Sequence, residues 1–167
     1  MVDTTNMITV EDLPTRLRAD AEMFVEMAEA AARFIRRHPA CISIKKSYLD
    51  RGLAGVLAVF YFELESRDPD TLPAAWVLCG ALPMMFAPSA VAVDGMDAIA
   101  RYLEALDVWC WAVRLHESAE EFPPVFNLEG TALLEPTDEH ADYIEPHTKS
   151  MREMIVPWLE DWTPDQE

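Results

Sequence analysis

LAGVLAVFYFELES (residues 53–66) and AAWVLCGAL (residues 74–82) are the two stretches of sequence that predict the fold. Both are rich in the β-branched and aromatic side chains that favour strands. In the first stretch, Tyr61 and Glu63 alternate with bulky apolar residues, which is the period of two that a strand gives its side chains. The intervening RDPDTLP has the composition of a turn. The sequence therefore predicts an antiparallel hairpin of residues 54–65 and 74–82.

Helices are predicted on both sides of this hairpin in the chain. Apolar side chains recur every three or four positions from Leu17 to Ile35, which predicts an N-terminal helix over about residues 12–37. Asp94 is a favourable cap for a second helix, over residues 95–117, which carries a similar apolar stripe.

The region 137–162 is acidic and helical in pattern. Thr137 can cap a helix over roughly residues 138–161. Proline has no backbone N–H and clashes with the preceding turn. We therefore expect an interruption near Pro146 and a kink or a restart at Pro157.

The fold class predicted from these segments is α+β, a small antiparallel β-sheet packed against three or so α-helices. Further strands are expected near residues 41–46 and 124–134. No internal repeat or Gly/Ser-rich linker divides the chain, so residues 1–167 are expected to form a single domain.

The uncharged run from Thr71 to Val93 is long enough to cross a bilayer. Glycine and several prolines interrupt it and no basic residues flank it, so we expect no membrane span. The first residues also lack the basic cluster and apolar core of a signal peptide. The three cysteines are far apart and form no C-x-x-C pair, which favours buried free thiols in the cytoplasm.

The net charge of -17 is unevenly distributed. Residues 1–51 hold eight acidic and eight basic side chains, so the other residues, with 22 acids and five bases, carry the whole excess. Such a surface repels phosphate groups, which argues against nucleic-acid and anionic-membrane binding. It favours a basic protein as partner. Plain solubility is the alternative interpretation.

Trp111 occupies an unusual position on the helix expected at residues 95–117. At about 100° per residue, it falls on the side of Glu104 and Asp107, away from the main apolar stripe. Either the acidic C-terminal region covers it, or it is a surface anchor for a partner.

Met84, Met85 and Phe86 follow the second strand and lie between two prolines. Methionine adapts to irregular surfaces, so an exposed turn of this composition would suit binding, whereas a buried one would cap the core. The predicted partner-binding residues are Trp111, Glu104, Asp107, Met84, Met85 and Phe86.

The sequence contains no pattern that predicts catalysis. Glycine-rich phosphate loops, G-x-S-x-G and H-E-x-x-H are absent, and no histidine lies near Cys79 in the sequence to activate it. His140 and His147, set among acids, are the nearest approach to a metal site, although a solvated acidic face explains them more simply. No catalytic residue, metal or cofactor is assigned, and the balance is against an enzyme.

The central part of the chain, about residues 56–106, resembles a family of small uncharacterised bacterial domains. In that family a strand ending in Glu-Ser precedes a W-V-x-C-G-x-L-P segment and an amphipathic helix. The family tends to carry an acidic residue after the glycine, where this chain has Ala81. The resemblance implies a bacterial, cytoplasmic α+β domain and no particular activity. The matching residues are Glu65, Ser66, Trp76, Val77, Cys79, Gly80, Leu82 and Pro83.

Three functional hypotheses follow. The first is a non-enzymatic protein-binding protein, in particular an acidic immunity-type partner that neutralises a basic protein. The second is a small metal-dependent hydrolase that uses the acidic cluster around His140 and His147. The third is a structural homodimer joined through the aromatic helix.

Overall fold

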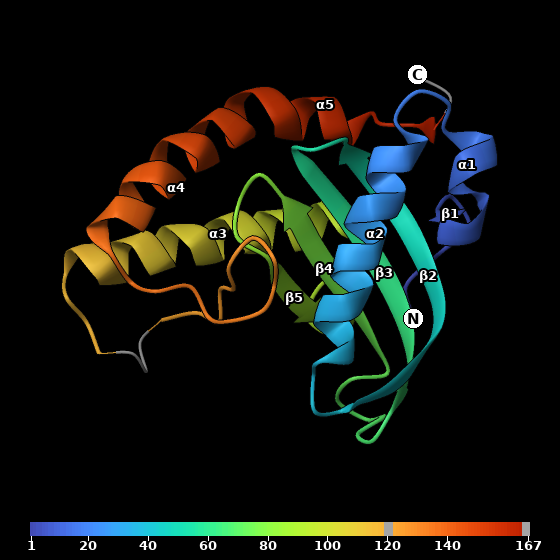
Figure 1. Cartoon of the computed structure of the whole chain (residues 1–167), viewed down its shortest axis with the longest axis horizontal. Helices are drawn as coiled ribbons and strands as arrows, with labels where there is room; N and C mark the ends of the chain where they lie inside the picture. Colours follow the sequence, from blue (N-terminus) through green and yellow to red (C-terminus); the bar gives the residue numbers. More distant parts are fainter. Residues whose placement is uncertain (119–121, 165–167) are drawn as a thin grey trace.

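An antiparallel sheet with helices on both faces forms the core of the computed structural model, which describes residues 1–118 and 122–164 (Figure 1). In these residues five strands follow one another across the sheet in chain order, each antiparallel to its neighbour. The predicted α+β class is confirmed. The strands are β1 (Ile8–Thr9), β2 (Cys41–Leu53), β3 (Leu57–Ser66), β4 (Ala74–Gly80) and β5 (Met85–Pro88).

β3 and β4 are the hairpin that the sequence predicts. Their register pairs Tyr61 with Trp76 and Phe60 with Val77, and the two central strands are buried over most of their length. Both faces of β3 are buried because α2 (Ala21–Arg36) crosses one face of the sheet while α3 (Gly95–Arg114) lies against the other (Figure 1).

β2 is much longer than the strand expected at residues 41–46. Its pairing with β3 shifts register three times, between Cys41 and Ser43, between Ile44 and Lys46, and after Leu49. Each bulge places an extra residue in one strand and disturbs the alternation of side chains. The strand is therefore poorly visible as a period of two in the sequence.

The N-terminal helix expected over residues 12–37 is broken. α1 covers Leu13–Arg16 and is followed by extended backbone at Leu17, and α2 begins after Asp20. Leu13 and Leu17 are both fully buried. Leu17 reaches the core from extended backbone, so the spacing of apolar residues continues through the break. For this reason the periodicity of the sequence did not reveal the break.

α3 begins and ends close to the predicted positions. The Asp94 side chain accepts a hydrogen bond from the backbone N–H of Asp97 at 2.8 Å, as a cap does. Gly95, the first helical residue, lies so close to β2 that a Cβ atom there would fall 1.9 Å from Oδ2 of Asp50. Glycine at this position leaves room for the Asp50 side chain beside the first turn of α3.

The acidic C-terminal region forms an arc of helix over α3 and the end of the sheet (Figure 1). The Thr137 hydroxyl accepts from the His140 N–H, as predicted, but the helix runs through Pro146 without interruption. A π-helical turn then precedes a restart with Pro157 in its first turn. The elements are α4 (Asp138–Ser150), η3 (Met151–Ile155) and α5 (Val156–Glu160).

The strand expected near residues 124–134 is absent from the described structure. Only Phe126 bridges, to Met84 on one side and to Leu133 on the other. Pro123 and Pro124 precede it and supply no N–H to a ladder. The segment is therefore a loop that closes over the end of β5.

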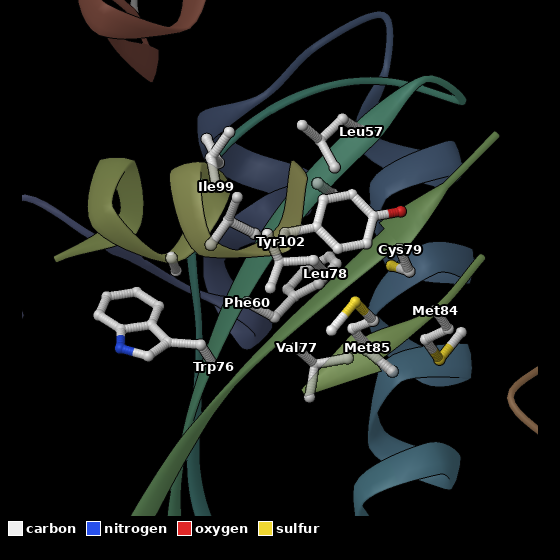
Figure 2. Close-up of a cluster of buried hydrophobic side chains, with 14 of the residues drawn as sticks. Leu57, Phe60, Trp76, Val77, Leu78, Cys79, Met84, Met85, Ile99 and Tyr102 are labelled. Atoms are coloured by element: carbon white, nitrogen blue, oxygen red, sulfur yellow. The ribbon is translucent and has the colours of Figure 1, made fainter. Parts of the chain in front are cut away.

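The uncharged run of residues 71–93 forms β4, β5 and their connections rather than a helix. Figure 2 shows Val77, Leu78 and the two methionines of this run within the core, with Tyr102 of α3 packed close by. Among the described helices, none has the length and apolar character needed to span a membrane.

Candidate functional site

Trp111 lies on the outer surface of α3 with 59% of its area exposed. The helix presents its opposite side to the core, where Tyr102, Leu106 and Trp109 are buried. The sequence placed Trp111 on the side away from the apolar stripe, and the structure bears this out. The alternative, that the acidic C-terminal region covers it, is wrong for the residues described.

Two further apolar side chains extend the exposed surface around Trp111. Val108 and Leu115 are 41% and 52% exposed and lie three residues before and four residues after it. At about 100° per residue the three side chains fall within an arc of about 60° on the helix. We call this stripe, with Glu104 at its N-terminal end, the Trp111 surface.

α4 packs beside the Trp111 surface instead of over it, because Arg114 ties the two helices together. Its guanidinium donates to Asp138 at 3.0 Å, to Asp142 at 2.5 Å and to Glu145 at 3.2 Å. The hydrogen bonds to Glu145 and Asp142 raise the pKa of Arg114 further above its usual range. One cation thus meets three carboxylates. We call Arg114 together with Asp138, Asp142 and Glu145 the acidic clamp. It keeps a net negative charge at the edge of the Trp111 surface.

Asp107 makes a second tie between α3 and the C-terminal arc. Its carboxylate accepts a hydrogen bond from Arg152 of the π-helical turn. Glu104 is exposed and forms no ion pair with any residue that the structure describes. Glu104 is therefore the more available acid of the two predicted contacts.

Met84 and Met85 do not form an exposed turn. They are 1% and 8% exposed, and Figure 2 shows both side chains beside Val77 and Cys79 in the core. Hydrogen bonds in both directions between the backbones of Met84 and Phe126 cover the turn with the 125–134 loop. The structure thus removes both methionines from the accessible surface, whereas Phe86 is half-buried.

Phe86 instead lines a cavity of about 180 Å³ at the C-terminal end of α2. Its ring lies edge-on to Phe34 at 6.1 Å and to His38 at 5.1 Å between centroids. The sequence singled out Phe86 for an exposed turn, but Phe86 lies in the wall of this partly open cavity.

His140 and His147 are both occupied by backbone contacts on α4. Nδ1 of His140 lies 2.8 Å from the carbonyl oxygen of Glu135, and Nδ1 of His147 lies 2.6 Å from that of Tyr143. Three of the neighbouring carboxylates, those of Asp138, Asp142 and Glu145, are directed to Arg114. Within residues 1–118 and 122–164, no three His, Cys, Asp or Glu side chains are grouped as metal ligands.

All three cysteines, Cys41, Cys79 and Cys110, are free and buried, as expected. Burial raises the pKa of the Cys79 thiol to about 12, and burial with the nearby Glu145 raises that of Cys110 to about 12. A thiol with so high a pKa is not a nucleophile near neutral pH.

Sequence reasoning missed the residues that frame the Trp111 surface. Val108 and Leu115 carried a usable signal, since their spacing from Trp111 places them on the same side of a helix. Arg114 carried a weaker one, as an isolated base before the acidic C-terminal region. Its three partners lie at least 24 residues away, and only the fold brings them together.

Comparison with known proteins returns no match: no family model, no curated protein and no solved structure is similar to the chain.

Proposed function

We propose that the protein is a non-enzymatic binding protein whose contact surface is the Trp111 surface and whose partner is basic. The observation that carries the proposal is the exposure of Trp111 between Val108 and Leu115 on a helix that is otherwise well packed. Tryptophan is the residue type most enriched among interface residues with large binding energies, where it fills a desolvated pocket of the partner.

Charge supports a basic partner. The acidic clamp leaves more carboxylates than cations beside the stripe, and Glu104 adds another at its end. An acidic rim speeds encounter with a basic surface and rejects acidic ones. It also argues against the homodimer hypothesis, because a symmetric dimer centred on Trp111 would place each acidic rim against its own copy.

An immunity-type role is the specific form of this proposal, in which the partner is a basic toxin neutralised inside the cell that makes it. A cytoplasmic setting belongs to the proposal too, because buried free thiols suit a reducing compartment. A toxin-like reading frame next to the gene would support this role. A metabolic operon would favour the hydrolase hypothesis instead.

The proposal is tested by recovering partners from the native host with the wild-type chain and with Trp111→Ala. Trp158→Ala is the matched control, since Trp158 of α5 is also an exposed tryptophan, at 42%. The partner is then purified and its dissociation constant measured for each form. We expect to recover a basic partner that Trp111→Ala binds at least tenfold more weakly, a loss of about 1.4 kcal/mol or more. Trp158→Ala should bind it as the wild type does.

Salt provides a second readout of the same complex. Raising the ionic strength should slow association of the wild-type pair, because an acidic rim steers a basic partner. Two results would contradict the proposal: the recovered partner is acidic, or both variants bind it as the wild type does. Either result would show that the Trp111 surface is not the interface for a basic partner.

A further inference from the structure

The cavity lined by Phe86 is assembled from three separate segments of the chain. The last turn of α2 contributes Phe34, and Arg37 follows directly after the helix. β5 contributes Phe86, and the 125–134 loop contributes Phe126 and Gly130. Its volume is about 180 Å³. For comparison, an apolar cavity of about 150 Å³ is large enough to hold benzene.

The walls are aromatic and are held by edge-to-face contacts. Phe34 meets Phe126 with centroids 4.8 Å apart and an interplanar angle of 69°, and meets Phe86 at 6.1 Å and 61°. His38 closes a further side, edge-on to Phe86 at 74°. Rings in such arrangements offer both faces and edges to a further ring. The space therefore suits one aromatic ring.

The loop that closes the cavity has a fixed shape. The Asn127 side chain accepts from the backbone N–H of Thr131 at 2.8 Å, and Gly130 has a φ of +68°. A Cβ atom on Gly130 would lie 2.9 Å from the ring of Phe34 and 2.8 Å from Sδ of Met84. The loop can approach α2 this closely only because glycine stands there, and this approach forms one wall of the cavity.

Arg37 brings a positive charge to the mouth of the cavity. Its Nη1 donates to the carbonyl oxygen of Gly130 at 2.9 Å, which orders the guanidinium. No carboxylate among the described residues forms an ion pair with it. In a chain with 30 acids and 13 bases, an arginine that is held beside an apolar cavity, and that pairs with no acid in residues 1–118 and 122–164, is available to an anion.

The surroundings of Arg37 add positive charge. Arg33 and Arg36 lie in the last turn of the same helix, and Arg67 donates to the carbonyl oxygen of Pro39 at 2.7 Å. The C-terminal end of α2 offsets only about half of one charge. These arginines therefore more than offset the partial negative charge at the end of the helix.

We propose that this cavity binds a small aromatic carboxylate, with the ring among Phe34, Phe86 and Phe126 and the carboxylate at the Arg37 guanidinium. The guanidinium has N–H donors beyond the one that holds Gly130, and a carboxylate accepts two in parallel. The site is separate from the Trp111 surface, so it neither depends on the proposed protein partner nor excludes one.

Phenylacetate is the probe, and binding to the wild-type chain is measured by calorimetry and by ligand-observed NMR. Three ligands separate the parts of the proposal. Phenylacetate should bind saturably, 2-phenylacetamide should bind at least tenfold more weakly because it lacks the charge, and 1-naphthylacetate should be excluded by its size. Equal affinity for the acid and the amide, or no saturable binding of phenylacetate at about 10 mM, would overturn the proposal.

Variants locate the site. Arg37→Gln should weaken phenylacetate binding about tenfold or more, whereas Arg18→Gln, an exposed position before the N-terminal end of α2 and away from the cavity, should leave it unchanged. Arg37→Lys keeps the charge and should retain part of the affinity even if the bond to Gly130 is perturbed. Equal loss in Arg18→Gln and Arg37→Gln would show that general charge, and not this cavity, attracts the ligand.

Discussion

Trp109 and Trp111 are two residues apart on α3 and have opposite surroundings. Trp109 is 1% exposed and meets Phe122 edge-on with ring centroids 6.1 Å apart, whereas Trp111 is 59% exposed among acids. The two side chains differ by about 200° around the helix axis. The comparison teaches that position on this helix, rather than residue type, separates a residue that holds the fold from one available to a partner.

The largest effect is expected from Trp109→Ala. Removing a large buried aromatic side chain leaves a cavity and should lower the free energy of unfolding by about 3–5 kcal/mol. Denaturant unfolding followed by circular dichroism measures this. A loss below about 1 kcal/mol would mean that Trp109 is not packed as described, and the contrast with Trp111 would disappear.

Gly95→Ala tests whether the orientation of α3, which decides which tryptophan is buried, is fixed at its first residue. The new Cβ would fall 1.9 Å from Oδ2 of Asp50, so the buried Asp50 carboxylate and its ion pair with Arg51 must shift. We expect a loss of about 1–3 kcal/mol, as for overpacking. Ala100→Ser, on the exposed side of the next turn, is the control and should be neutral. An unchanged unfolding midpoint would show that α3 is not anchored there.

Arg114→Gln tests the contact between α3 and α4. In the acidic clamp, Arg114 of α3 holds α4 beside Trp111. We expect a lower thermal midpoint at low salt and a difference from the wild type that shrinks as salt is added. Arg101→Gln, which breaks a single exposed pair with Asp97, should change the midpoint less. Equal shifts of the thermal midpoint in the two variants would show that the clamp stabilises the fold no more than a single exposed ion pair does.

Cys110, between the two tryptophans, allows a test by pH. Burial and nearby acids raise the pKa of its thiol from 9.0 to about 12. Between these values the unfolded chain releases the proton and the folded chain retains it. The stability that this group contributes is therefore complete below pH 9.0 and is lost as pH rises to about 12. The stability difference between wild type and Cys110→Ala should narrow across this range; a constant difference would contradict burial of the thiol.

The sequence predicts the centre of this molecule better than its ends. The hairpin and α3 are visible because their apolar patterns are uninterrupted and Asp94 marks the start of the helix. The break at Leu17 was missed because the helical spacing of apolar residues continues across it. The full length of β2 was missed because its bulges disturb the alternation of side chains.

The two sites differ in the same way. Trp111 could be placed on the correct side of its helix because helical geometry is local, but whether another segment covers it depends on how α4 packs. The cavity at Phe86 could not be predicted at all. Its walls come from residues 34–39, from β5 and from residues 126–131, which only the complete fold brings together.

The most direct test of the central claim measures Trp111→Ala twice, for stability and for affinity. The free energy of unfolding should stay within about 0.5 kcal/mol of the wild type, as for an exposed position, while the dissociation constant for the basic partner rises at least about tenfold. Unchanged affinity in a variant of unchanged stability would contradict the assignment of this surface to binding.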